Sequence, residues 1–176
     1  YFYGKQNVPT ETYRTSPADY GAKVNAFVEQ YTVGKDEATG FPIVAAPAGS
    51  DIYLRASTWQ WYPVLQLEKG QEYRLHISSM DLQHGFSLQP VNINLQVVPG
   101  YDYVATITPT STGDFTIVCN EYCFVGHHTM VGKIIVHGDT REQAMARMRT
   151  ALLETGVEGI QTNIPLHREL MVDAKF

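Results

Sequence analysis

Short runs of alternating apolar and polar residues fill the chain from Asp51 to Val136. The runs read DIYLRASTWQWYPVLQL, EYRLHIS, NINLQVV, YVATITPT, FTIV and VGKIIV, with turn signals such as EKGQ, PGYD and STGD between them. Alternation with a period of two is typical of strands that bury one face. About seven such strands with regular turns indicate a sandwich or barrel. We therefore expect a mainly β fold.

Residues 1–50 have a different pattern, and we expect them to form an arm that contains one helix. In SPADYGAKVNAFVEQY, Ser16 can cap a helix, Pro17 suits its first turn, and Asp19 stands three residues after the cap. Apolar residues then recur at helical spacing, namely Val24, Phe27, Val28 and Tyr31. GKDEATG predicts a turn after the helix. An irregular surface arm is the alternative.

The sequence contains no run of about 20 apolar residues, so it predicts no transmembrane helix. The best candidate, FPIVAAPAG, is short and is interrupted by Pro42 and Pro47. No signal-peptide pattern follows residue 1. The chain opens on YFYG, and aromatic residues crowd the ends of membrane spans. We therefore expect a membrane anchor upstream of this sequence.

The charge balance argues against nucleic acid as a partner. The chain carries 13 Lys and Arg against 18 Asp and Glu, a net charge of −5. Binding to nucleic acid requires clustered basic residues that neutralise phosphates. A negative protein suits a basic protein partner instead. The candidates for steering such a partner, or else for an ordinary solvated face, are Asp81, Asp102, Asp114 and Glu121.

The segment CNEYCFVGHHTM concentrates soft and nitrogen ligands in twelve residues. Cys119 and Cys123 are four apart, His127 is four further on, and Met130 follows three beyond. Thiolate, imidazole and thioether together favour copper over hard cations. The segment lies between the last two expected strands, and His84 lies in the expected turn DLQHGF. Loops at one end of a rigid sandwich are frequent places for sites.

Other uses of these residues stay open at this point. A disulfide is the usual use of two cysteines in an extracytoplasmic protein, but it leaves the histidine and methionine unused. Zinc could take two cysteines and a histidine, but it does not account for Met130. A single blue copper needs one cysteine, two histidines and a methionine, so one cysteine is surplus. Two thiolates could instead bridge two copper ions, with one histidine on each and His84 as the second.

The pattern H-x(34)-C-x-E-x-C-x(3)-H-x(2)-M resembles the CuA centre of cytochrome c oxidase subunit II. DLQHGFSLQPVNINLQVVPG resembles the segment of that family that carries the first histidine, and HGF…NIN is most similar to B-type haem–copper oxidases. The resemblance covers roughly residues 41–136. It implies a cupredoxin-like Greek-key sandwich or barrel that holds dinuclear copper. The implied ligands are the bridging thiolates of Cys119 and Cys123, the imidazoles of His84 and His127, the thioether of Met130 and the backbone carbonyl of Glu121. The pattern leaves out His128.

By this resemblance the chain is an electron-transfer subunit of a terminal oxidase. It would accept electrons from cytochrome c or another small redox donor and pass them to catalytic subunit I, where oxygen is reduced. It would lie on the periplasmic face of the cytoplasmic membrane, held by its anchor. A copper-delivery or copper-storage protein is the alternative from another class, and it would use the same ligands in an exposed, exchangeable form.

Two tryptophans are candidates for accepting the electron. STWQWYPV places Trp59 and Trp61 two residues apart, which predicts one shared strand face. QWY resembles the aromatic segment through which the family accepts electrons, so Trp61 is the first candidate and Trp59 the second. Packing in the core or at a subunit interface is the alternative for each.

From Gly138 the composition changes, and residues 138–176 predict a helical tail. TREQAMARMRTALLE offers Thr140 and Gln143 as a capping box, followed by the apolar stripe of Met145, Met148 and Leu152. VGKIIVHGDTREQAMARM and EGIQTNIPLHREL resemble the C-terminal end of biotin carboxylases over roughly residues 131–176. No carboxylase body precedes them, so we do not expect carboxylation.

The tail therefore indicates a gene fusion, a chimeric sequence or a recruited docking element. An interaction module derived from such a tail is the third functional alternative. The expected domains are the arm at residues 1–50, the copper domain at 51–137 and the helical tail at 138–176.

Overall fold

The computed structural model describes residues 8–89, 91–137, 165–166 and 169. The chain divides into two compact units, Tyr1–His137 and Gly138–Phe176. The fold described below is that of the first unit. Most of the helical tail lies outside the described residues and stays a prediction. None of the helices in the described ranges is both long and apolar enough to cross a membrane.

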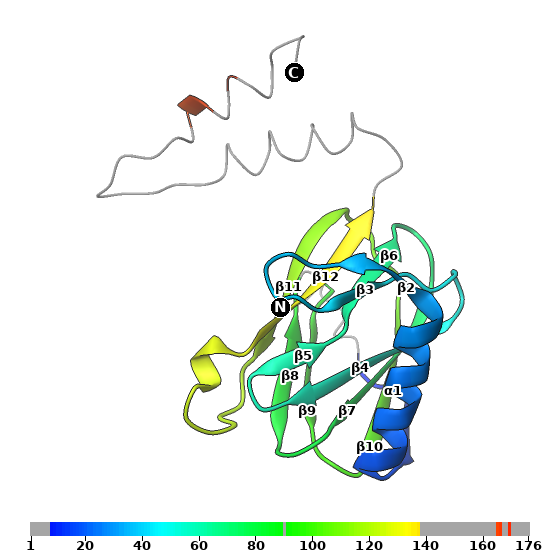
Figure 1. Ribbon diagram of the computed structural model, residues 1–176, viewed down its shortest axis with the longest axis vertical. Helices are drawn as coiled ribbons and strands as arrows, with labels where there is room; N and C mark the ends of the chain where they lie inside the picture. Colours follow the sequence, from blue (N-terminus) through cyan, green and yellow to red (C-terminus); the bar gives the residue numbers. More distant parts are fainter. Residues whose placement is uncertain (1–7, 90, 138–164, 167–168, 170–176) are drawn as a thin grey trace, which may run out of the picture. The chain divides into compact units, whose positions relative to one another are not determined.

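Two sheets form a sandwich that does not close into a barrel in the described part of the chain (Figure 1). One sheet has the order β1-β10-β7-β4-β5, and the other has the order β2-β3-β6-β12-β11-β8-β9. The elements are β1 Glu11–Arg14, α1 Pro17–Tyr31, β2 Thr32–Lys35, β3 Pro42–Val44, β4 Asp51–Ser57, β5 Gln60–Tyr62, β6 Val64–Glu68, β7 Tyr73–Ser79, β8 His84–Leu88, β9 Ile93–Val97, β10 Tyr101–Ile107, β11 Gly113–Cys119, η1 His127–Thr129 and β12 Val131–His137. The predicted mainly β class is confirmed.

Helix α1 begins where its capping residues predict. The backbone N–H of Asp19 donates to Ser16 Oγ over 3.1 Å, and Pro17 occupies the first turn. The helix buries Tyr20, Val24 and Phe27, and the Tyr20 hydroxyl donates to the backbone oxygen of Leu54 in β4 over 3.1 Å. The helix therefore packs on the five-stranded sheet.

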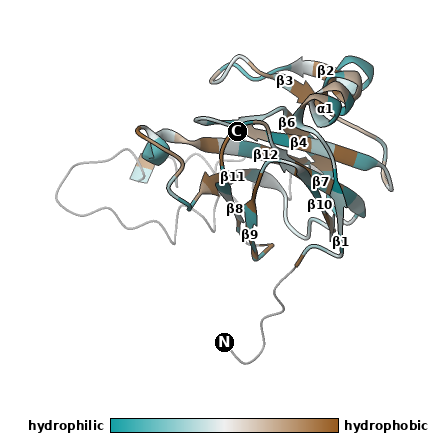
Figure 2. Ribbon diagram, turned by 90° about the horizontal axis from the view of Figure 1, so that it is seen from below, coloured by the Kyte–Doolittle hydropathy of each residue, from teal (hydrophilic) through white to brown (hydrophobic). Residues whose placement is uncertain are grey.

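The rest of the expected arm is hydrogen-bonded into the sandwich. Strand β1 pairs antiparallel with β10, and β3 pairs in parallel with β6, so the N-terminal segment contributes to both sheets. Figure 2 shows α1, β2 and β3 on one side of the remaining strands. These short strands lack a clear alternation of apolar and polar residues, which is why the sequence pattern did not predict them.

The core lies between the two sheets and follows the alternation of the strands. In β4 every second residue is buried, which places Ile52, Leu54 and Ala56 inside. Phe86 of β8 and Ile117 of β11 are fully buried in the facing sheet. Burial of each large apolar side chain contributes about 1.5–3 kcal/mol to folding. This core gives the strand ends a rigid base.

The segment predicted as one long alternating run is divided into three strands. A two-residue turn, Thr58–Trp59, connects β4 to β5, with Ser57 paired to Gln60 across it. The turn reverses the chain between the two tryptophans, so the predicted shared face for Trp59 and Trp61 is wrong. Trp59 is 49% exposed, whereas Trp61 is 2% exposed.

Candidate metal centre

Three adjacent strands of the seven-stranded sheet bring the candidate ligands to one end. Strand β11 lies between β8 and β12 and ends at Cys119. Its neighbour β8 begins at His84, which corrects the expectation that this histidine lies in a turn. The backbone N–H of Cys119 donates to the Met130 carbonyl over 3.2 Å, immediately before β12 begins. Strand pairing therefore closes the 34-residue gap between the first histidine and the loop.

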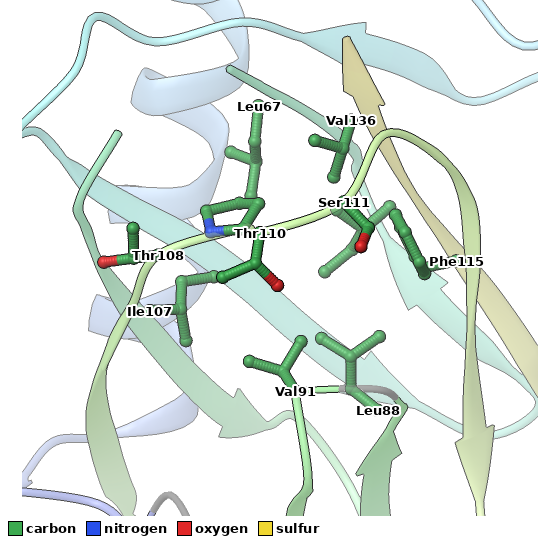
Figure 3. Close-up of a pocket in the computed structure, with 11 residues that line it drawn as sticks. Leu67, Leu88, Val91, Ile107, Thr108, Thr110, Ser111, Phe115 and Val136 are labelled. Carbon is green, nitrogen blue, oxygen red and sulfur yellow. The ribbon is translucent and has the colours of Figure 1, made fainter. Parts of the chain in front are cut away.

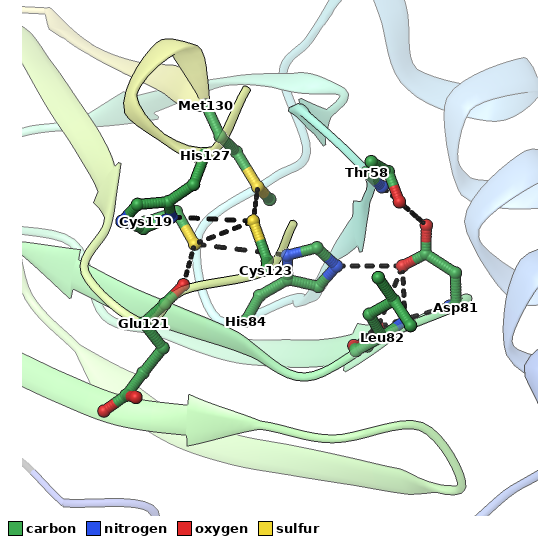
Figure 4. Close-up of polar contacts among 10 residues, drawn as sticks. Thr58, Asp81, Leu82, His84, Cys119, Glu121, Cys123, His127 and Met130 are labelled. Carbon is green, nitrogen blue, oxygen red and sulfur yellow. Dashed lines mark hydrogen bonds and ion pairs between the residues drawn. The ribbon is translucent and has the colours of Figure 1, made fainter. Parts of the chain in front are cut away.

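The two cysteines are buried free thiols whose sulfur atoms lie 3.8 Å apart. Each sulfur is faced by one imidazole nitrogen (Figure 4). His84 Nδ1 lies 4.0 Å from Cys119 Sγ, and His127 Nδ1 lies 3.6 Å from Cys123 Sγ. The arrangement places two sulfurs between two imidazoles.

Two weaker donors complete the cluster. Met130 Sδ lies 3.7 Å from Cys123 Sγ, and the Cys119 thiol donates to the Glu121 backbone oxygen over 3.3 Å. The structure thus brings together all six residues that the sequence pattern selected. His128, the neighbour that the pattern leaves out, is exposed.

Four of the side chains in the cluster are buried, whereas His127 is half-buried. His84 is fully buried and Met130 is 1% exposed. Burial, together with the hydrogen bond and the charge of Cys119, raises the pKa of the Cys123 thiol to about 11. A cation must therefore displace thiol protons to bind. Two thiolates, two imidazoles and a thioether fit copper.

Asp81 is part of this centre, a role that the sequence analysis missed. His84 Nε2 lies 2.8 Å from Asp81 Oδ1, and the backbone N–H of Leu82 donates to the same oxygen over 2.6 Å. Desolvation alone would raise the pKa of Asp81, but hydrogen bonds from His84, Thr58 and Leu82 outweigh it and lower the pKa to about 2. An ionised carboxylate only accepts, so Nε2 of His84 carries the proton and Nδ1 is left for a metal.

Two of the four acidic residues that were candidates for steering a partner, Asp81 and Asp102, have other roles in the structure. Asp81 is committed to His84 and Thr58. Asp102 is 2% exposed and lies 2.9 Å from His76 Nδ1, so it cannot present its charge to a partner. The spacing of three residues between Asp81 and His84 was the available signal for the first role.

The two tryptophans have different surroundings and each contacts the ligand segments in its own way. The Trp61 ring is buried, and its centroid lies 6.3 Å from that of His84 and 5.4 Å from that of Phe86, edge to face in both cases. The Trp59 indole is half exposed and packs against Gly126, the residue before His127. Trp61 therefore supports the site from inside, and Trp59 stands at the surface.

Several exposed apolar side chains lie on the ligand loops and on the Thr58–Trp59 turn. We call this set the apolar rim, and its members are Trp59, Leu82, Tyr122, Phe124 and Val125, with exposed fractions between 44% and 74%. Clustered exposed apolar groups are typical of interaction sites.

The structure also contains a cavity of about 230 Å³, shown with its lining in Figure 3. It is lined by Leu88, Phe115 and Val136, which lie at the opposite ends of the three strands that carry the ligands. Leu88 is four positions from His84 and Phe115 is four positions from Cys119, which corresponds to about 13 Å of strand in each case. The cavity is therefore not part of the metal centre.

Comparison with known proteins assigns the sandwich to a family. Over 95 residues the chain is 33% identical to cytochrome c oxidase subunit 2 of Thermus thermophilus, an alignment that covers 53% of this chain and 70% of the relative. The chain belongs to the cytochrome c oxidase subunit 2 family. A probable cytochrome c oxidase subunit 2 of Streptomyces avermitilis is also 33% identical, over 81 residues that cover 46% of this chain and 25% of the relative.

The fold of this subunit 2 family member is also found in a solved structure. Rusticyanin from Thiobacillus ferrooxidans superposes with a TM-score of 0.52 at 18% identity, and the match covers 74% of this chain and 99% of that chain. This similarity supports the cupredoxin-like fold, and the predicted fold class is confirmed.

The C-terminal part of this subunit 2 family member matches a second family. The model of the biotin carboxylase C-terminal domain matches residues 117–176. The biotin carboxylase of Haemophilus influenzae is 50% identical over 50 residues, which cover 28% of this chain and 11% of the enzyme. The predicted resemblance of the tail is confirmed. The first 21 residues of this match, 117–137, nevertheless lie in the sandwich unit, in the segment that runs from β11 through η1 to β12.

Proposed function

We propose that this chain is the electron-transfer subunit of a haem–copper terminal oxidase and that it holds dinuclear copper of the CuA type. The observation that carries the proposal is the pair of buried free thiols 3.8 Å apart, each faced by one imidazole Nδ1. Membership of the subunit 2 family supports the oxidase assignment.

In this proposal the thiolates of Cys119 and Cys123 and the imidazoles of His84 and His127 would hold the copper pair. Met130 and the Glu121 carbonyl would act as weak donors. When bound, the copper pair takes up and releases one electron that both ions share. The chain keeps several donors in place, because His84 and Cys119 stand at the ends of packed strands and Met130 directly precedes β12.

Burial of the donors also decides what the site does not do. Six donors from this chain would occupy the positions on the copper and leave none for oxygen, so oxygen reduction would belong to another subunit. Copper delivery requires exposed donors that exchange readily, whereas His84, Cys119, Cys123 and Met130 are at most 4% exposed. A single blue copper would leave one buried thiol without a role.

The partners follow from the same proposal. The electron donor is cytochrome c or another small redox protein, and catalytic subunit I receives the electron. The apolar rim supports a docking site next to the centre. The domain would lie on the periplasmic face of the cytoplasmic membrane, where a soluble electron donor in the periplasm could reach it. The acidic residues Asp114 and Glu121 remain candidates for steering.

Copper stoichiometry tests this proposal. Reduced protein is loaded with copper, freed of excess and assayed for copper per chain, beside Cys119→Ser and His128→Ala. We expect two copper ions in the wild type, at most one in Cys119→Ser, and two in His128→Ala, which removes an exposed imidazole next to a ligand. One copper per chain in both the wild type and Cys119→Ser would overturn the dinuclear assignment.

A further inference from the structure

We propose that the Thr58–Trp59 turn positions the histidine ligands, with Thr58 acting through Asp81 on His84. The inference rests on the copper function proposed above, and it assigns a role to residues that supply no ligand atom. Both ends of the turn carry hydrogen bonds or packing contacts that lead to a ligand histidine.

Thr58 fixes one oxygen of the Asp81 carboxylate with two donors. Its backbone N–H and its hydroxyl both donate to Asp81 Oδ2, over 2.6 and 2.5 Å. The other oxygen, Oδ1, takes the contacts from Leu82 and from His84 Nε2. The carboxylate is therefore held from both sides, and its plane cannot rotate without breaking one of these bonds (Figure 4).

A fixed carboxylate determines which nitrogen of His84 is free. Because ionised Asp81 only accepts, it holds the proton on Nε2 and leaves Nδ1 toward Cys119 Sγ. Carboxylate partners of ligand histidines commonly set the tautomer and the ring orientation. Thr58 is thus a positioning residue, the first member of a hydrogen-bonded series that continues through Asp81 to the ligand His84.

The register of the five-stranded sheet places Thr58 next to Asp81. Strand β4 pairs in parallel with β7 up to Ala56 and Ser79, and the backbone N–H of Met80 donates to the Ala56 carbonyl over 2.9 Å. Two residues beyond this last pair, the two segments reach Thr58 and Asp81. Both segments leave the sheet side by side, so the contact between them is built into the fold.

The second residue of the turn reaches the other histidine. Trp59 has φ of 70°, a left-handed conformation that is unfavourable for a bulky side chain. In this conformation its indole lies against Gly126, where a Cβ would stand 2.6 Å from Trp59 Nε1. Gly126 itself has φ of 98° and directly precedes His127. The strained turn therefore also packs against the start of the second ligand segment.

The experiment compares Thr58→Val with Thr58→Ser. Valine keeps the shape and removes the hydroxyl, whereas serine keeps the hydroxyl. The first readout is the ¹⁵N spectrum of the histidine rings in reduced, metal-free protein, which reports the tautomer of His84. We expect a single tautomer, with the proton on Nε2, in the wild type and in Thr58→Ser, and a mixture in Thr58→Val.

The second readout is the dissociation constant for copper. We expect Asp81→Asn to raise it about 10–100-fold, Thr58→Val to raise it by a smaller factor, and Thr58→Ser to leave it unchanged. A Thr58→Val protein with the wild-type tautomer and the wild-type copper affinity would overturn the inference. Failure of the wild type to bind copper would instead reject the proposed function, while the tautomer in metal-free protein would still decide the role of Thr58.

Discussion

Gly132 lies directly against the indole of Trp61, because a Cβ on Gly132 would stand 2.6 Å from the Trp61 Cβ. Gly132 is the second residue of β12 and follows Met130 by two positions. Trp61 in turn meets the rings of His84 and Phe86 edge to face. The absence of a side chain at one position of β12 therefore allows a buried tryptophan to support the ligand cluster.

Replacement of Gly132 by alanine should destabilise the protein. The new methyl group would overlap the base of a fully buried side chain, and overpacking of this kind costs about 1–3 kcal/mol. Urea unfolding measures the loss. Gly34→Ala is the matched control, because a Cβ there meets no atom within 4 Å. Equal stabilities of the two variants would contradict the close contact with Trp61.

Replacement of Met130 by leucine should preserve the fold and change the metal centre. Leucine fills a similar volume in the core, so the free energy of unfolding should fall by less than about 1.5 kcal/mol. The thioether that lies 3.7 Å from Cys123 Sγ is lost, so the reduction potential and the visible spectrum should shift while the copper content stays the same. Met80→Leu, whose side chain packs against Gly21, should leave both unchanged. An unaltered spectrum in Met130→Leu would show that the thioether is not a donor.

The ion pair between Lys133 and Asp36 should make stability depend on pH at both extremes. The hydrogen bond to Lys133 lowers the pKa of the Asp36 carboxyl below 3.8, and the same bond raises the pKa of Lys133 above 10.5. Asp36 thus contributes stability above pH 3.8 that is lost as the pH falls through its lowered pKa. Lys133 contributes stability below pH 10.5 that is lost as the pH rises through its raised pKa.

The measurement is urea unfolding of the wild type and Asp36→Asn across pH. Asp36 is 5% exposed, so Asp36→Asn should cost about 1–3 kcal/mol between about pH 5 and pH 9, and the difference should shrink outside that range. Asp114→Asn removes the exposed second partner of Lys133, 3.8 Å away, and should cost at most about 1 kcal/mol. A difference for Asp36→Asn that does not vary with pH would reject the ion pair as its source.

Removal of Phe124 from the apolar rim should slow electron uptake from the donor. Phe124 is 60% exposed and has φ of 115°. Asn is enriched at positive φ, so Phe124→Asn should leave stability and copper content unchanged. A lost docking contact of about 1 kcal/mol would lower the second-order rate with reduced cytochrome c about fivefold. Tyr13→Asn, an exposed aromatic on β1, should leave the rate unchanged. Equal rates in the two variants would exclude Phe124 from the docking site.

Structural features that are determined by residues close together in the chain could be predicted from the sequence. Ser16, Pro17 and Asp19 determine the start of α1 through local hydrogen bonds and backbone geometry. The ligand set from Cys119 to Met130 lies on one loop, so its spacing alone indicated a soft metal. The alternation in β4 indicated a strand, because burial on one face imposes a period of two.

Features that depend on strand pairing could not be predicted in this way. The role of Thr58 arises because β4 and β7 end side by side, which no local pattern reveals. A two-residue turn separates Trp59 from Trp61 in space, although both fit one alternating run. His84 was expected in a turn, but it begins β8, since its pairing with Val97 of β9 extends the sheet by that residue.

The electron paramagnetic resonance spectrum of the oxidised, copper-loaded protein tests the central claim most directly. One unpaired electron shared equally by two copper nuclei of spin 3/2 should split into a seven-line hyperfine pattern. A four-line pattern from a single copper nucleus would contradict the dinuclear centre and would assign the second thiol another role.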